Sequence, residues 1–200
     1  MNWNEYFIRM AELVAEKSKD PSTKVGVVVV GPDNEILSTG FNGFPRGVRE
    51  HAVEECDNCN GNGWTLYEGA MSTRRQSCVK CCLEDAPPGY LAKDEIDPER
   101  WERPLKYLFV EHAERNAVHN AARIGVSLKG ATMYFNFEPC PCNECAKAII
   151  QSGIKRLVGY NRKFPGKGHQ WEESLDVART MLEEAGVEMV EIDESAHSGT

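Results

Sequence analysis

Four residues of the sequence have the types and spacing that suit a metal-dependent reaction. His112 and Glu114 form an H-x-E motif, and Cys142 and Cys145 form a C-x-x-C motif directly after a proline. One imidazole and two thiolates are ligands that zinc prefers, and three protein ligands leave the fourth tetrahedral position to water. Zinc lowers the pKa of that water to about 7, and Glu114 is suited to carry its protons. The motifs therefore predict a hydrolytic zinc site.

The same residues also allow simpler interpretations. Two cysteines at this spacing can form a buried thiol pair without metal, and a glutamate near a helix start can merely complement the helix dipole. A metal-free pair leaves the H-x-E motif unexplained, so we favour the zinc site. Cys140 has the wrong spacing to replace Cys142 and is left out of the ligand set.

Both motifs are expected at the starts of helices in a chain that alternates helices and strands. A glycine follows three of the helices, which is the usual C-terminal stop. Such alternation predicts a three-layer α/β/α sandwich with a central mixed sheet of about five strands. The expected helices are residues 5–18, 113–124, 142–152 and 171–185, and the expected strands are residues 25–30, 36–41, 132–137, 156–160 and 187–192.

Residues 48–104 differ from the rest, because apolar periodicity disappears and cysteines accumulate. Cys56, Cys59, Cys78 and Cys81 form two C-x-x-C pairs with 18 residues between them, a spacing typical of four-cysteine zinc sites. We expect a closed structural zinc here, whose binding energy replaces a missing core. Cys82 can pair with Cys78 in place of Cys81, and a thiol cluster without metal is the alternative.

The composition is typical of a globular protein that acts on a small molecule. Of 200 residues, 41% are hydrophobic and 27% charged, and the net charge of −8 argues against a nucleic-acid partner. No apolar run reaches the roughly 18 residues that span a membrane, so we expect a cytoplasmic protein with reduced cysteines. The expected organisation is one catalytic domain over residues 1–192, the zinc-binding insertion at about 48–104, and a disordered tail at 193–200.

Four stretches of the sequence resemble the deoxycytidylate (dCMP) deaminases of the cytidine deaminase superfamily. They are residues 20–26, 39–47, 112–117 and 141–147, and the resemblance covers residues 5–50 and 107–192. The H-x-E and P-C-x-x-C motifs are shared by zinc-dependent nucleobase deaminases generally, whereas the first two stretches separate this family from its relatives. The resemblance implies a cytidine deaminase-like fold and hydrolysis of dCMP to dUMP and ammonia, which supplies dUMP for thymidylate synthesis.

The resemblance also implies roles for individual residues. His112, Cys142 and Cys145 match the zinc ligands, and Glu114 matches the proton shuttle. Asn42 resembles an asparagine that binds the deoxyribose and positions the base, although it can also serve only the turn in which it lies. The weaker candidates for binding the phosphate or sugar are Ser22, Lys24 and Tyr160.

Regulation and assembly are implied by the resemblance alone. The family is commonly hexameric, and dCTP activates and dTTP inhibits at a site between subunits that binds the nucleotide with Mg²⁺. Phe44, Arg46 and Arg123 resemble parts of that site.

Three alternative functions remain open at this point. The enzyme can also accept dCTP, or it can act on a base in tRNA or single-stranded DNA, although the latter requires a basic, aromatic groove. A nucleotide-binding module without catalysis is the third, and the intact Glu114 argues against it.

Overall fold

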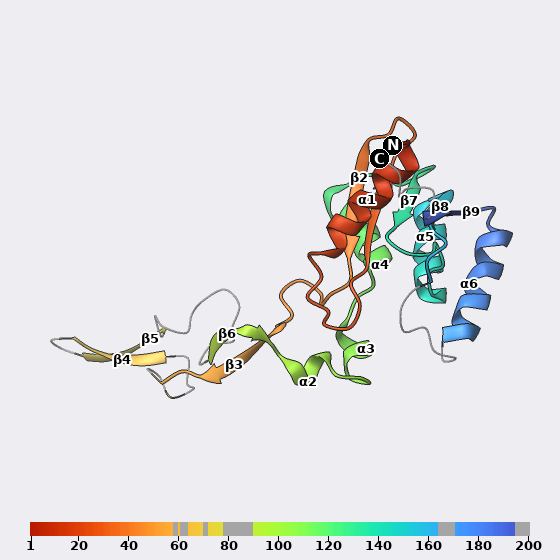
Figure 1. The fold of residues 1–200 in the computed structure, drawn as a ribbon. Helices are drawn as coiled ribbons and strands as arrows, with labels where there is room; N and C mark the ends of the chain where they lie inside the picture. The colour runs from red at the N-terminus through yellow and green to blue at the C-terminus, as the bar shows by residue number, and fades with distance from the viewer. Residues whose placement is uncertain (58–59, 61–63, 70–71, 78–89, 164–170, 195–200) are drawn as a thin grey trace. The chain divides into compact units, whose positions relative to one another are not determined.

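The computed structural model describes residues 1–57, 60, 64–69, 72–77, 90–163 and 171–194 (Figure 1). The chain forms two compact units, one of Met1–Gly43 with Glu111–Thr200 and the other of Phe44–Val110. No helix among the described residues is long and apolar enough to cross a membrane.

The first unit contains a five-stranded mixed sheet in the order β2-β1-β7-β8-β9. The interior strand β1 is antiparallel to both of its neighbours, whereas β7, β8 and β9 run parallel to one another. The expected mixed sheet of about five strands is therefore confirmed. The strands are β1 (Gly26–Val30), β2 (Ile36–Phe41), β7 (Thr132–Phe135), β8 (Arg156–Tyr160) and β9 (Glu188–Ile192).

Helices cover both faces of this sheet. Successive strand residues face opposite sides, so Val27 and Val29 pack with α4, α5 and α6, whereas Val28 and Val30 pack with α1. All four valines are buried, as the apolar run at 25–30 predicts. The expected three-layer α/β/α sandwich is thereby confirmed. The helices are α1 (Trp3–Ala15), α4 (Ala113–Ile124), α5 (Asn143–Ser152) and α6 (Glu172–Glu184).

Several element boundaries differ from the expected ones by one to three residues, and two of these differences have local reasons. Helix α1 begins at Trp3, because Asn2 and Glu5 form a reciprocal capping box: each side chain accepts the other's backbone N–H, at 3.0 and 3.1 Å. Strand β7 ends at Phe135, because the Asn136 side chain turns to β1 and accepts the Gly26 N–H at 3.0 Å.

The second unit has strands where the sequence suggested none. It contains two antiparallel pairs, β3 with β6 and β4 with β5, and an aromatic cluster in which the Phe44 ring stacks on Trp101 at 4.5 Å and on Phe109 at 5.3 Å. The elements are β3 (His51–Glu55), β4 (Trp64–Gly69), β5 (Ser72–Ser77), β6 (Tyr90–Ile96), α2 (Pro98–Trp101) and α3 (Lys106–Phe109).

The expected four-cysteine site lies mostly outside the described residues. Cys56 is described and is fully buried. Cys59, Cys78, Cys81 and Cys82 fall outside them, as do residues 195–200 of the expected tail.

Candidate metal centre

The first turn of α4 lies unusually close to β2, and Gly40 makes this possible. A Cβ atom at Gly40 would lie 2.1 Å from the Ala113 carbonyl oxygen and 2.5 Å from the Ala117 nitrogen. Any side chain at this position would therefore push α4 off the sheet. His112 and Glu114 lie at the start of α4, so the close approach of α4 to β2 determines how far both side chains lie from the sheet.

Hydrogen bonds from α4 fix the helix along β2. The side-chain amides of Asn116 and Asn120 each donate to a β2 carbonyl, those of Phe41 and Thr39, both at 2.8 Å. Because the two asparagines lie one turn apart, they prevent α4 from sliding or rotating on the strand.

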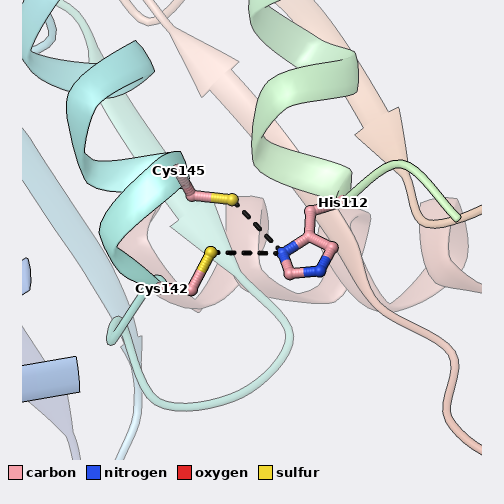
Figure 2. A group of neighbouring side chains, drawn as sticks. All are labelled: His112, Cys142 and Cys145. Atoms are coloured by element: carbon pink, nitrogen blue, oxygen red, sulfur yellow. Dashed lines mark hydrogen bonds between the residues drawn. The ribbon is translucent and has the colours of Figure 1, made fainter. Parts of the chain in front are cut away.

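His112, Cys142 and Cys145 converge where α4 and α5 begin (Figure 2). His112 is the N-cap residue of α4, Cys142 is the N-cap residue of α5, and Cys145 lies in the first turn of α5. The His112 Nδ1 atom lies 3.4 Å from each sulfur. The three potential ligand atoms lie within 4.8 Å of one another, and this is the group able to hold a metal within the described part of the chain.

The geometry of this group fits zinc. Tetrahedral zinc with its usual bonds to nitrogen and sulfur separates the two kinds of atom by about 3.6 Å. The 3.4 Å separations are close to that value, so little movement is needed to admit the ion. The donor set of one nitrogen and two sulfurs is also one that selects zinc.

The two thiols hold their protons unequally. The pKa of Cys142 falls to about 4, because its sulfur accepts a hydrogen bond from Cys145 and another from His112. The pKa of Cys145 rises well above its usual value, because its thiol donates that bond and is buried. One thiolate is therefore present at neutral pH, and the pair shares the remaining proton.

The pKa of His112 is raised by its surroundings. Burial lowers it, but the hydrogen bond to Cys142 and the charge of Glu114 together outweigh burial. Without metal, the imidazole of His112 therefore keeps its second proton to a higher pH than an exposed histidine does. Metal ligation needs the neutral imidazole and both thiolates, so protons must leave when the metal binds.

Glu114 is buried beside this group, with 8% of its surface exposed. Burial raises the pKa of its carboxyl group, and the charge of His112 opposes that effect. A carboxyl group of raised pKa can hold a proton at a higher pH than an exposed glutamate, which suits it to proton transfer.

Glu111, which the sequence did not indicate, supports the backbone of His112. Its carboxylate accepts the backbone N–H of His112 at 2.8 Å and pairs with Arg115 at 2.5 Å. The carboxylate thus fixes the backbone that carries the imidazole. An acidic residue before H-x-E is too common a feature to have indicated this role.

Asn42 lies in a buried network that shapes residues 20–25. Its side-chain amide donates to the Asp20 carboxylate and to the Thr23 carbonyl, both at 2.9 Å, and its Oδ1 accepts the Val25 N–H at 2.8 Å. Both amide hydrogens are therefore used within the protein. The turn-forming role of Asn42 is present in the structure, and only the second lone pair of Oδ1 is left for a ligand.

The other expected substrate residues lie in different settings. Ser22 and Lys24 are exposed in the loop that Asp20 organises, and the Ser22 N–H donates to the Asp20 carboxylate at 2.8 Å. Tyr160 is buried with Phe7 beneath α1, on the sheet face opposite α4 and α5.

The residues expected to sense nucleotides are divided between the two units. Phe44 is buried in the aromatic cluster of the second unit, and Arg46 is exposed in that unit. Arg123 is exposed in the last turn of α4. Their expected role stays a prediction.

Two further residues near the site come from the start of α6. The Trp171 ring lies 6.1 Å from the His112 ring, measured between centroids, and Ser174 hydrogen-bonds Asn143 at the start of α5. The residue types of Trp171 and Ser174 do not predict this position, because it depends on how α6 packs against α5.

Comparisons with known proteins agree with this site. Residues 1–161 match the family model described as the cytidine and deoxycytidylate deaminase zinc-binding region. The deoxycytidylate deaminase of Enterobacteria phage T4 is 36% identical over 192 residues, which cover 92% of this chain and 87% of the phage protein. The human deoxycytidylate deaminase is 32% identical over 188 residues, covering 94% and 78% of the two chains.

A solved structure supports the same conclusion. The dCMP deaminase of cyanophage S-TIM5, in complex with dCMP and dUMP, matches with a TM-score of 0.54 and 26% identity, covering 94% of this chain and 95% of that one. Fold and site together are those of a hydrolytic deaminase. The chain belongs to the cytidine and deoxycytidylate deaminase family, and the resemblance seen in the sequence is confirmed.

Proposed function

We propose that the protein hydrolyses dCMP to dUMP and ammonia and so supplies dUMP for thymidylate synthesis. The observation that carries the proposal is the convergence of His112, Cys142 and Cys145 beside the buried Glu114. The names of the similar proteins, and the dCMP and dUMP bound to the cyanophage enzyme, support the choice of substrate.

In the proposed reaction His112, Cys142 and Cys145 hold a zinc ion, which when bound lowers the pKa of water and so provides the nucleophile. Glu114 accepts a proton from the water that attacks C4 of the cytosine ring, and it delivers this proton to ring N3. It then takes the proton of the new C4 hydroxyl group and transfers it to the amino group, so that the C4–N bond breaks, ammonia leaves and the hydroxyl oxygen becomes the C4 carbonyl of the uracil ring. The carboxyl group moves both protons, and its burial keeps bulk water from intercepting them.

Substrate binding is assigned to the loop that follows α1, to Asn42 at the end of β2, and to the end of β8. Asn42 offers the free lone pair of Oδ1 to a deoxyribose hydroxyl, since its N–H groups are already donated. The exposed Lys24 ammonium and Ser22 hydroxyl suit a phosphate group. Tyr160 is the candidate whose burial beneath α1 fits this role least.

Regulation is proposed from the family resemblance. A hexamer would bind dCTP or dTTP with Mg²⁺ between subunits, through Arg46 and Arg123, whose exposed guanidinium groups suit phosphates. Phe44 would act indirectly, because its ring packs on Trp101.

A second, structural zinc is proposed for the insertion within residues 44–110. Its ligands would be Cys56, Cys59, Cys78 and Cys81, and the support is their spacing together with the burial of Cys56. Four thiolates leave no position for water, so this ion would take no part in catalysis.

Ammonia release from parallel substrates tests the proposed function. The panel contains dCMP, dCTP, cytidine and an RNA hairpin, each assayed with the zinc-loaded protein. We expect turnover of dCMP to exceed that of the other three. Release of ammonia from dCTP at an equal or faster rate would mean that dCMP is not the preferred substrate. Release from the RNA hairpin would support a nucleic-acid deaminase. If none of the four compounds releases ammonia, a binding module without catalysis is supported.

A further inference from the structure

Both ligand-bearing helices begin at a residue whose side chain is used in the metal centre. An N-cap side chain normally accepts a backbone N–H from the first turn of its helix. His112 and Cys142 occupy the N-cap positions of α4 and α5, yet neither makes a side-chain cap bond. Instead, the His112 ring and the Cys142 sulfur face each other. The N–H of Asn143, the first residue of α5, is not one that an N-cap side chain normally reaches, so it needs an acceptor from elsewhere.

Ser174, in the first turn of α6, supplies this acceptor. Its Oγ accepts the backbone N–H of Asn143, the first residue of α5, at 3.1 Å. The same hydroxyl donates to the Asn143 Oδ1 at 3.0 Å, and that oxygen also accepts the Glu144 N–H at 2.9 Å. A hydroxyl from a neighbouring helix thus provides an acceptor for the first N–H group of α5.

The same turn of α6 also contacts the other ligand-bearing helix. Trp171, the N-cap residue of α6, has its ring 6.1 Å from that of His112 and tilted by 51°. Residues three apart lie on one side of a helix, so Trp171 and Ser174 face the metal centre together. One turn therefore touches the starts of both α4 and α5.

We propose that this first turn of α6 positions the zinc ligands. Ser174 holds the start of α5, the helix that carries both cysteines, and Trp171 limits rotation of the His112 ring. The proposal rests on the proposed zinc site. Partners that orient metal ligands typically change metal affinity by about 10–100-fold when they are removed. Trp171 and Ser174 are positioning residues, because they act through the ligands.

The test follows zinc release to a chromogenic chelator from purified, zinc-loaded protein. We expect Ser174→Ala to lose zinc about 10-fold faster than the wild type, and Ser174→Thr, which keeps the hydroxyl, to stay within about 2-fold. Thr180→Ala is the matched control, because Thr180 lies on α6 and its exposed hydroxyl donates to the Asp176 carbonyl of the same helix. It should release zinc at the wild-type rate.

Trp171 is tested by the visible spectrum of the cobalt-substituted protein, which reports ligand geometry without turnover. Trp171→Ala should alter the d–d bands and Trp171→Phe should largely restore them. Should Ser174→Ala fail to fold, Ser174→Cys, which retains a weak acceptor, replaces it.

Three outcomes would overturn the proposal. They are wild-type zinc release from a folded Ser174 variant that lacks the hydroxyl, equally fast release from Thr180→Ala, and an unchanged cobalt spectrum in Trp171→Ala. Failure of the wild type itself to bind zinc, or cobalt without thiolate charge-transfer bands, would instead reject the proposed metal site.

Discussion

Replacing Gly40 by alanine should separate catalytic geometry from stability. The added Cβ would lie 2.1 Å from the Ala113 carbonyl oxygen, whereas real contacts of this kind are at least 3.0 Å. The start of α4 must therefore retreat by about 0.9 Å, and it carries His112 and Glu114 with it. Misplacement of catalytic groups by about 1 Å can cost roughly 100-fold in rate. Overpacking of this kind also costs about 1–3 kcal/mol of unfolding free energy.

The assay measures kcat/KM for ammonia release per folded, zinc-loaded molecule, together with the unfolding free energy in urea. Gly130→Ala is the matched control: its φ of +79° strains an alanine, yet among the described residues no atom beyond its two chain neighbours lies within 4 Å of the new Cβ. That strain costs about 1–2 kcal/mol without moving α4. We expect both variants to lose stability and Gly40→Ala alone to lose about 100-fold in activity. Activity within 3-fold of wild type in Gly40→Ala, or an equal loss in Gly130→Ala, would refute the reasoning.

Four further predictions concern protons, metals and effectors. The Glu114→Gln variant should keep its zinc and lose turnover by about 10²–10⁴-fold. Near-normal ammonia release from the zinc-loaded variant would contradict the mechanism. Zinc added to metal-free protein at pH 7 should release protons, because the pKa of Cys145 is raised, and a pH indicator in weak buffer detects them; no release would mean both thiols are already ionised. Metal analysis should find two zincs per chain, one of which disappears when Cys56 and Cys59 become serine; a single zinc in wild-type protein prepared without chelator argues against the second site. The dCMP kinetics should be sigmoidal, hyperbolic with dCTP and suppressed by dTTP; indifference to both nucleotides would show that control is absent.

The parts of the structure that the sequence predicted depend on short-range patterns. The alternation of Val27 to Val30 between two helical layers follows from an apolar run in a central strand. The pairing of Cys142 with Cys145 follows from their separation of three positions at a helix start. The Asn2–Glu5 capping box was not predicted, because the expected helix began at residue 5.

The parts that it did not predict depend on contacts between distant segments. The hydrogen bonds from the Asn42 amide to Asp20 and Thr23 were not predicted, because these residues precede Asn42 by two strands. Strand β3 pairs with β6 across the polar insertion, where no alternating pattern marks either strand. Ser174 reaches Asn143 only because α6 packs against α5. Residue types alone do not specify such pairings.

The asparagines that hold α4 on β2 also protect the rim of the sheet. Strand β2 is an outer strand, and outer strands expose backbone groups that invite strands of other molecules to add on and aggregate. The carbonyls of Thr39 and Phe41 are already occupied by Asn120 and Asn116. Replacing both asparagines would therefore do more than loosen a helix: it would uncover a template for intermolecular β-pairing, and self-association would increase with protein concentration.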